Sequence, residues 1–102
     1  MKSFFWAMLP GLLMPLLSHA GETPKQLAAR HQCFGCHAVN EFRVGPAFQQ
    51  VAERYGVRKD AITYLFNEVK AGSVGKWGST PMPPETVPDP ELKNILVWVM
   101  QQ

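Results

Sequence analysis

The sequence predicts an all-α domain, and three observations lead to this fold class. Apolar residues recur at helical spacing in three separate segments. Prolines, glycines and capping residues mark the ends of the expected helices. No segment shows the two-residue alternation of β-branched side chains that is typical of a strand. The chain has 102 residues, 46% of them hydrophobic and 18% charged, which is typical of one small folded domain rather than a disordered or fibrous protein.

The first 20 residues have the pattern of a secretory signal peptide. Met1 and Lys2 provide a positive start, an apolar stretch runs from Phe4 to Leu17, and Ser18-His19-Ala20 offers small residues for cleavage. The apolar stretch is shorter than the roughly 20 residues needed to span a bilayer, and prolines interrupt it. No cysteine directly follows it to carry a lipid. We therefore expect cleavage after Ala20 and one exported domain over residues 21–102.

The first expected helix begins after Thr23. Thr23 and Gln26 are spaced as in a capping box, in which each side chain binds the backbone of the other residue. Pro24 suits the first helical position, where a backbone N–H is not needed. These residues predict a helix from Pro24 to about Cys33.

Three further helices are predicted from their apolar stripes. Each stripe has residues at positions i, i+3, i+4 and i+7, which places them on one buried face. The stripes are Phe48, Val51, Ala52 and Tyr55; Ile62, Leu65, Phe66 and Val69; and Leu92, Ile95, Leu96 and Val99. Pro46 is expected to begin the first of these helices and Gly56 to end it. Asp60 is expected to cap the next, Gly72 to end it, and Asp89-Pro90-Glu91 to begin the last.

Two segments lack the pattern of a helix. Residues 38–45 form a loop between the first two helices, and residues 72–89 form a longer loop rich in glycine and proline. A loop of this length is unusual in a domain of this size, and such loops are usually functional. The longer loop contains Trp77 and Met82, so we expect it to contribute to a functional site.

The charge balance argues against nucleic-acid binding. Lys and Arg number 10 against 8 Asp and Glu, a formal net charge of +2, and Lys2 lies in the predicted signal peptide. Proteins that bind nucleic acids by charge usually carry a clear basic excess. We therefore expect no nucleic-acid partner.

The motif that carries chemistry is Cys33-Phe34-Gly35-Cys36-His37. Its C-x-x-C-H pattern is the attachment signature of c-type haem, in which two thiols add to the haem vinyl groups and the histidine ligates iron. Cysteines three apart near the end of a helix can reach two vinyl groups of one porphyrin. Gly35 leaves room for the macrocycle to approach the backbone. The motif predicts one covalently bound haem.

Other uses of the two cysteines fit the sequence less well. A disulfide between them would close a loop too short to constrain the unfolded chain much. A thioredoxin-like dithiol needs a strand leading into a helix within a βαβ unit, which the pattern lacks. A zinc site needs four ligands, and beyond the motif the chain offers only His31 and a few acids.

The second axial ligand decides what a haem protein with His37 on the iron can do. A six-coordinate iron passes electrons, whereas an open site binds small molecules. The mature chain offers three candidates: Met82, Met100 and His31. Met100 follows an apolar stripe and reads as core packing, and His31 lies too close to the attachment cysteines to reach the opposite haem face. Met82 lies in Thr80-Pro81-Met82-Pro83-Pro84, where the prolines stiffen a non-helical strap, and is the expected ligand.

Four segments of the chain together resemble the small bacterial class I cytochromes c, the short monohaem carriers that serve nitrite reductases and terminal oxidases. The resemblance covers residues 21–102 and implies about four helices wrapped around one haem. The matching segments are Cys33-Phe34-Gly35-Cys36-His37, Val44-Gly45-Pro46-Ala47, Gly72-Ser73 with Gly75-Lys76-Trp77-Gly78, and Pro81-Met82-Pro83-Pro84.

The resemblance implies further site residues. In this family the proline at the position of Pro46 offers its carbonyl to the proximal histidine, and the tryptophan at Trp77 points its indole N–H toward a haem propionate. Two positions depart from the family pattern. Glu85 stands where relatives often have an asparagine that binds the methionine sulfur, and Glu68 stands where some relatives have a basic propionate partner. Both departures bear on the tuning of the reduction potential and on its pH dependence.

The function expected from these residues is that of a periplasmic electron carrier, not an enzyme. Cys33 and Cys36 would hold the haem, with His37 and Met82 as metal ligands. The resemblance implies redox protein partners: a donor such as a quinol-oxidising complex and an acceptor such as a nitrite reductase or terminal oxidase. We expect a monomer with no membrane insertion after cleavage. If docking is electrostatic, the candidate residues by position are Lys25, Arg30, Arg43 and Lys76.

Two alternative functions remain at this point. A haem enzyme or gas sensor would have a weak or absent bond to Met82 and would bind carbon monoxide quickly. An accessory haem subunit would stay bound to a larger oxidase or dehydrogenase.

Overall fold

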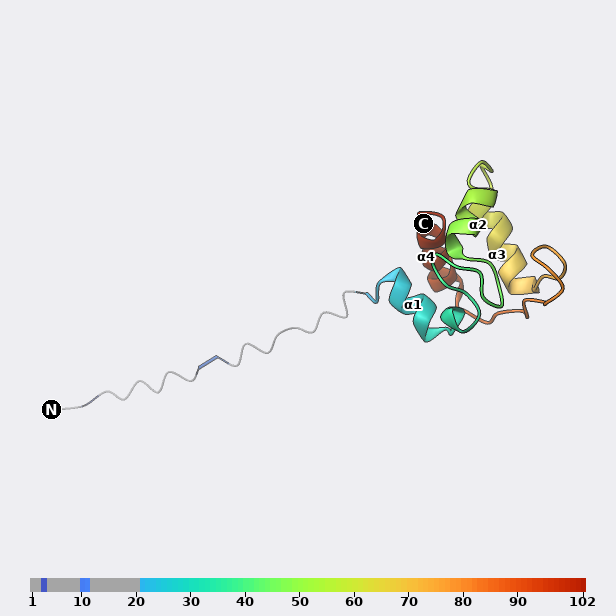
Figure 1. Cartoon of the computed structure of the whole chain (residues 1–102). Coiled ribbons are helices and arrows are strands. Elements are labelled where there is room, and N and C mark those ends of the chain that lie inside the picture. The colour runs from blue at the N-terminus through green and yellow to red at the C-terminus, as the bar shows by residue number, and fades with distance from the viewer. Residues whose placement is uncertain (1–2, 4–9, 12–20) are drawn as a thin grey trace.

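The computed structural model describes residues 3, 10–11 and 21–102. Apart from those three positions, the predicted signal peptide lies outside the described residues, and cleavage after Ala20 stays a prediction. The described part contains four α-helices and one 3₁₀ turn: α1 (Pro24–Arg30), η1 (Cys33–Gly35), α2 (Phe48–Tyr55), α3 (Ala61–Ala71) and α4 (Asp89–Val99) (Figure 1). Within it, the strand-like pairing is confined to an isolated bridge between Ser73 and Met82. The prediction of an all-α fold is confirmed.

Helix α1 begins as predicted and ends earlier than predicted. Thr23 Oγ1 accepts a hydrogen bond from the Gln26 backbone N–H at 3.2 Å, and Gln26 Oε1 accepts one from the Thr23 N–H at 2.9 Å. The helix ends at Arg30 rather than near Cys33, because Gln32 adopts a left-handed backbone conformation with φ of 62°. The attachment cysteines therefore lie on the separate turn η1 and not on α1.

The other helices agree with the apolar stripes, with two corrections. Helix α2 begins at Phe48 and not at Pro46, because Ala47 is its N-cap and its N–H donates to Gln50 Oε1 at 2.9 Å. Asp60 precedes α3 as predicted, but its carboxylate does not cap the helix. It accepts two hydrogen bonds of 2.9 Å from the Arg58 guanidinium instead, and a planar guanidinium suits this two-point contact.

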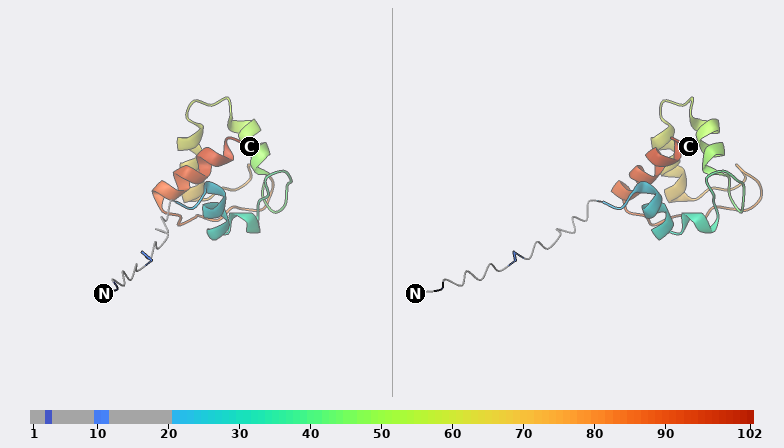
Figure 2. Two further views of the ribbon diagram at one scale, coloured as in Figure 1. Left: turned by 90° about the vertical axis from the view of Figure 1, so that its left-hand side faces the viewer. Right: turned by 60° about the vertical axis from the view of Figure 1, so that its left-hand side comes forward.

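Helix α4 lies at the centre of the packing. It contacts α1, α2 and α3, and Figure 2 shows it crossing the domain between them. Its buried residues are Leu92, Ile95, Leu96 and Val99, which are the stripe that the sequence predicts. Phe48 packs edge-on against both Phe34 and Trp98, with ring centroids 5.7 and 5.5 Å apart. Among the described residues, no helix is long and apolar enough to cross a membrane.

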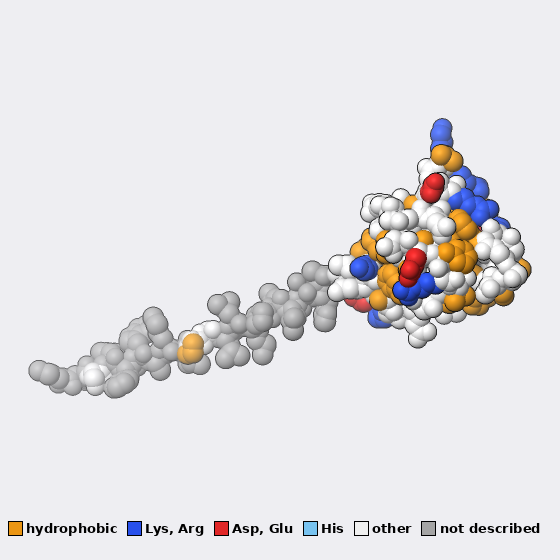
Figure 3. Space-filling view, in the orientation of Figure 1, with side chains coloured by type: hydrophobic (Ala, Val, Ile, Leu, Met, Phe, Trp, Pro, Cys, Tyr) orange, Lys and Arg blue, Asp and Glu red, His pale blue; other side chains and the backbone are white. Residues whose placement is uncertain are grey.

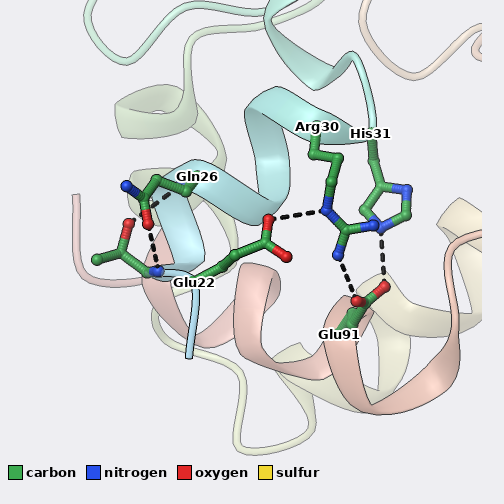
Figure 4. A network of polar contacts seen from close by, with 6 residues as sticks. Glu22, Gln26, Arg30, His31 and Glu91 are labelled. Carbon is green, nitrogen blue, oxygen red and sulfur yellow. Dashed lines mark hydrogen bonds and ion pairs between the residues drawn. The ribbon is translucent and has the colours of Figure 1, made fainter. Parts of the chain in front are cut away.

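A polar network ties α1 to the start of α4 (Figure 4). Arg30 donates to Glu22 Oε2 at 2.7 Å and to Glu91 Oε1 at 2.5 Å. His31 Nε2 lies 2.8 Å from the other oxygen of Glu91. Glu91 thus accepts from Arg30, the last residue of α1, and from His31, which follows it. His31, weighed above as an iron ligand, is engaged in this helix contact.

The network makes part of the stability depend on acid pH. Hydrogen bonds from His31 first, and from Arg30 second, hold the pKa of Glu91 below its ordinary value of 4.5. A carboxyl whose pKa is lowered by folding stabilises the fold above its ordinary pKa, and this contribution is lost as the pH falls through the lowered value. We expect Glu91→Gln to lower the melting temperature at pH 6, with the difference from the unmutated protein shrinking below about pH 4. Melting followed by circular dichroism from pH 3 to 7 measures this.

The control for this prediction is Glu41→Gln. Among the described residues, Glu41 pairs only with Arg43, two residues away on an exposed loop, at 3.1 Å, and such pairs contribute little. We expect this variant to follow the unmutated protein at every pH. An equal deficit of Glu91→Gln at pH 3 and pH 6 would contradict the prediction.

Candidate functional site

The six residues predicted for the site line one cavity: Cys33, Cys36, His37, Pro46, Trp77 and Met82. The cavity encloses about 1350 Å³ of empty space, counting its part that is open to solvent. Its wall comes from η1 and the residues just after it, the end of the loop before α2, the helices α2, α3 and α4, and the loop after α3. Most of the lining side chains are apolar, and the charged ones are Glu68, Lys76 and Glu85.

The two cysteines and His37 share one tight turn. The N–H groups of Cys36 and His37 both donate to the Cys33 carbonyl, at 3.3 and 3.0 Å. Within the described residues neither cysteine forms a disulfide, and Cys33 is half-buried while Cys36 is exposed. Burial, and then the carboxylate of Glu85, raise the pKa of the Cys33 thiol. The turn presents two thiols and an imidazole to the same cavity.

Three residues hold the His37 ring: Pro46, Phe48 and Gly45. Its Nδ1 lies 2.7 Å from the carbonyl oxygen of Pro46. Because a carbonyl only accepts, Nδ1 carries the proton and donates, which leaves the lone pair of Nε2 available for a metal. The ring stacks on Phe48 with centroids 5.2 Å apart and planes 21° from parallel. This is the contact with Pro46 that the family resemblance implies.

Gly45 is a site residue that the sequence reasoning missed. A Cβ added to it would lie 2.5 Å from His37 Cε1, closer than any real contact. Glycine therefore lets the backbone pass beside the imidazole. The signal was present, because Gly45 precedes Pro46 in a quoted segment, but a glycine in a loop does not by itself reveal which side chain it approaches.

Met82 is fixed by its backbone as well as by its flanking prolines. Its N–H donates to the Ser73 carbonyl at 2.9 Å, and its carbonyl accepts from the Ser73 N–H at 3.0 Å. Gly72 makes this pairing possible: its φ is 80°, and a Cβ there would lie 3.0 Å from the Met82 carbonyl oxygen. The Glu85 N–H donates to the Val69 carbonyl at 3.0 Å, which attaches the strap to α3.

The other two candidate ligands lie elsewhere. Met100 caps the end of α4 and packs against the core, and His31 contacts Glu91. Neither residue lines the cavity. Among the described residues, no three His, Cys, Asp or Glu side chains gather as a metal-ligand group.

A polar cluster lies at one part of the cavity wall. Lys76 Nζ lies 2.5 Å from Glu68 Oε2 and donates to the Tyr64 hydroxyl oxygen at 2.5 Å. These contacts, the one with Glu68 first, raise the pKa of Lys76. Lys76 thus brings a positive charge next to Glu68, the position where some relatives have a basic residue. Trp77 follows directly and is half-buried against the Tyr55 ring, at 6.4 Å between centroids.

Three of the four expected docking residues are in ion pairs. Arg30 contacts Glu22 and Glu91, Arg43 contacts Glu41, and Lys76 contacts Glu68. Their charges are partly neutralised within the chain, so a docking surface built on them would be weaker than their number indicates.

The residues of the cavity fit a covalently bound haem. Thiols and an imidazole lie together on one turn, the thioether of Met82 belongs to a separate strap of the same wall, and apolar core side chains form most of the remainder. A porphyrin requires such a combination: attachment points, nitrogen and sulfur donors, and apolar walls. Polar side chains that could bind the haem propionates occupy only a few positions in the cavity wall.

The comparisons with known proteins agree with this fit. The family model described as Cytochrome c matches residues 22–102. The chain is 43% identical over 91 residues to cytochrome c-552 of Hydrogenobacter thermophilus, covering 87% of this chain and 93% of that protein. It is 40% identical over 78 residues to cytochrome c-551 of Pseudomonas denitrificans, covering 76% and 95%.

A solved structure shows the same fold. The wild-type cytochrome c552 of Nitrosomonas europaea superimposes with a TM-score of 0.73 at 40% identity, covering 76% of this chain and 96% of that one. One haem c is covalently attached, and Cys33 and Cys36 fit its attachment motif. The chain belongs to the cytochrome c family, as a small bacterial class I monohaem electron carrier.

Proposed function

We propose that this protein is a periplasmic one-electron carrier in which His37 and Met82 are the two axial ligands of iron. The observation that carries the proposal is that both side chains line one cavity, whereas Met100 and His31 do not. When bound, the haem supplies a one-electron couple between Fe(II) and Fe(III). The residues of the chain hold the two ligands in place and exclude water from the cavity.

His37 suits a permanent ligand because its ring cannot turn freely. Donation from Nδ1 to the Pro46 carbonyl fixes the tautomer and increases the electron density at Nε2. Stacking on Phe48 and the close backbone of Gly45 limit rotation of the ring. A ligand held in this way keeps its geometry when the charge at the metal changes.

Met82 suits the opposite position for a similar reason. The two hydrogen bonds with Ser73 and the adjacent prolines set its backbone. A thioether ligand favours the reduced state and raises the reduction potential. Apolar residues of the wall, such as Leu65, Ile95 and Val99, limit the access of water to the site. This also raises the reduction potential.

The proposal includes that the protein is a carrier and not an enzyme. With His37 and Met82 both holding the iron, no coordination position would be left for a substrate. Docking would then be weak and transient, and exposed apolar residues such as Phe42, Val44 and Val74 are available for it. Figure 3 shows apolar side chains at several places on the visible face of the domain. The proposed partners are a quinol-oxidising complex as donor and a nitrite reductase or terminal oxidase as acceptor, with the carrier itself a monomer.

Optical spectra of the exported protein test the ligand assignment. We expect a sulfur-to-iron charge-transfer band in the oxidised protein, and a reduced protein that does not bind carbon monoxide. Met82→Ala should lose the band, bind carbon monoxide, and have a lower reduction potential, because the thioether that favours Fe(II) is gone. Met100→Ala is the matched control and should keep the band.

Two results would contradict the proposal. Loss of the band in Met100→Ala alone would move the ligand to α4. Absence of the band from the unmutated protein, together with rapid carbon monoxide binding, would mean an open iron site and would favour the enzyme or sensor function.

A further inference from the structure

Arg54, near the end of α2, contacts the loop that carries Met82. Its Nη1 donates to the Lys76 carbonyl oxygen at 2.7 Å. Its guanidinium carbon lies 4.5 Å from the centroid of the Trp77 ring and 5.5 Å from that of Tyr55. One side chain therefore binds both the backbone and an aromatic ring of the loop, and the ring belongs to the cavity wall.

The loop has few other attachments at this point. Ser73 and Met82 close its base with two hydrogen bonds. In the described part of the chain, no backbone–backbone hydrogen bond outside the helices involves residues 74–81. Gly75 and Gly78 have φ values of 80° and 122°, conformations that glycine adopts without strain. The tip is therefore held by side chains: Arg54 on the Lys76 carbonyl, and Lys76 on Glu68 and Tyr64.

We propose that Arg54 is a positioning residue that clamps the 73–82 loop, holds Trp77 in the cavity wall and slows departure of Met82 from the iron. The clamp rests on the contacts above, whereas its effect on Met82 rests also on the function proposed for that residue. Arg54 does not line the cavity and acts through the loop.

The chemistry of arginine explains why one residue can do this. A charged donor makes a stronger hydrogen bond to a carbonyl than a neutral one. The planar guanidinium can donate in its plane while it lies over an aromatic ring, which a lysine ammonium cannot reproduce. Among the ion pairs of the described residues, none involves Arg54. Its charge is therefore directed to the carbonyl and the rings rather than to a carboxylate.

Hydrogen exchange of the complete haem protein measures the clamp directly. We expect Arg54→Ala to speed exchange of the Ser73 and Met82 amides, whose hydrogen bonds close the base of the loop, about tenfold, as expected for loss of a hydrogen bond to a charged group. Amides of α1 and α4 should be unchanged. Arg54→Lys keeps the charge and the long stem, and should give a smaller increase at the same amides. Lys59→Ala removes an exposed charge from the nearby turn and should leave the loop as it is.

The rate at which added imidazole binds the oxidised protein measures departure of Met82. We expect this rate to rise severalfold in Arg54→Ala, less in Arg54→Lys, and not in Lys59→Ala. The charge-transfer band should persist in all three variants, because Met82 itself is retained.

Several outcomes would overturn the inference. Unchanged exchange of the Ser73 and Met82 amides in both Arg54 variants would show that the contact does not hold the loop. An equal rise throughout the domain would show a general loss of stability instead. If loop exchange becomes faster but imidazole binds at an unchanged rate, in a protein that shows the band, then Arg54 holds the loop without slowing the departure of Met82. An unmutated protein without the band would contradict the ligand assignment and not the clamp, which exchange alone tests.

Discussion

Replacing Cys33 and Cys36 together with alanine is expected to abolish covalent haem attachment and to leave residues 21–102 largely without stable tertiary structure. The reason is that core and cavity share their residues. Val51, Tyr55, Leu65, Leu92 and Ile95 are buried against the helices, and each of them also lines the cavity. A chain of this size has little apolar area to spare, and small domains often need a bound group to complete the core.

Two measurements check this result on protein exported from the same host. Haem that stays with the polypeptide after denaturation reports covalent attachment, and far-ultraviolet circular dichroism on heating reports cooperative folding. Each single variant, Cys33→Ala or Cys36→Ala, keeps one thiol for attachment and should retain haem and more of the helical signal than the double variant. A double variant that melts cooperatively with full helical signal would show that the helices pack without the haem.

Gly45→Ala is expected to weaken the binding of His37 to iron and to destabilise the fold. The added Cβ would lie 2.5 Å from His37 Cε1, 3.0 Å from Nδ1 and 3.1 Å from Nε2. The ring cannot retreat without breaking its hydrogen bond to the Pro46 carbonyl or its stacking on Phe48. Inserting a methyl group into a well-packed site typically costs about 1–3 kcal/mol. In a domain of this size that corresponds to a melting temperature lower by about 5–20 °C.

The melting temperature and the reduction potential measure the two parts of this effect. Loss of donation to Pro46 makes the imidazole a weaker donor to Fe(III), so we expect the potential to rise relative to the unmutated protein. Asn40→Ala, an exposed change in the same loop, should alter neither quantity. A Gly45→Ala protein with the melting temperature and potential of the unmutated protein would mean that the loop moves away from His37 at no cost.

Local patterns along the chain were enough to predict much of this molecule. The three stripes are reproduced in α2, α3 and α4, and the capping box at Thr23 begins α1 as expected. Helical spacing and capping depend on residues three or four apart, so a sequence contains the information directly. The haem attachment motif is equally local, because its two thiols and the histidine must share one turn.

The position at which α1 ends could not be predicted from local patterns. Gln32 is not a residue type that signals a left-handed conformation, yet its φ of 62° ends the helix and turns Cys33 out of it. The carboxylate of Asp60 likewise binds Arg58 rather than capping α3. Both outcomes depend on which competing local contact is stronger once the surrounding chain has packed, and spacing alone does not rank such contacts.

Residues close together in the chain were enough to predict the fold class, the presence of the four helices and the attachment of one haem, but not every helix boundary. Tertiary structure alone decided what surrounds the predicted ligands. Gly45 lies against the His37 ring, Ser73 pairs with Met82, and Arg54 reaches the Lys76 carbonyl across 22 positions of the chain. Contacts between distant segments arise from the packing of whole elements, and a backbone carbonyl that receives a donor has no signature in the sequence.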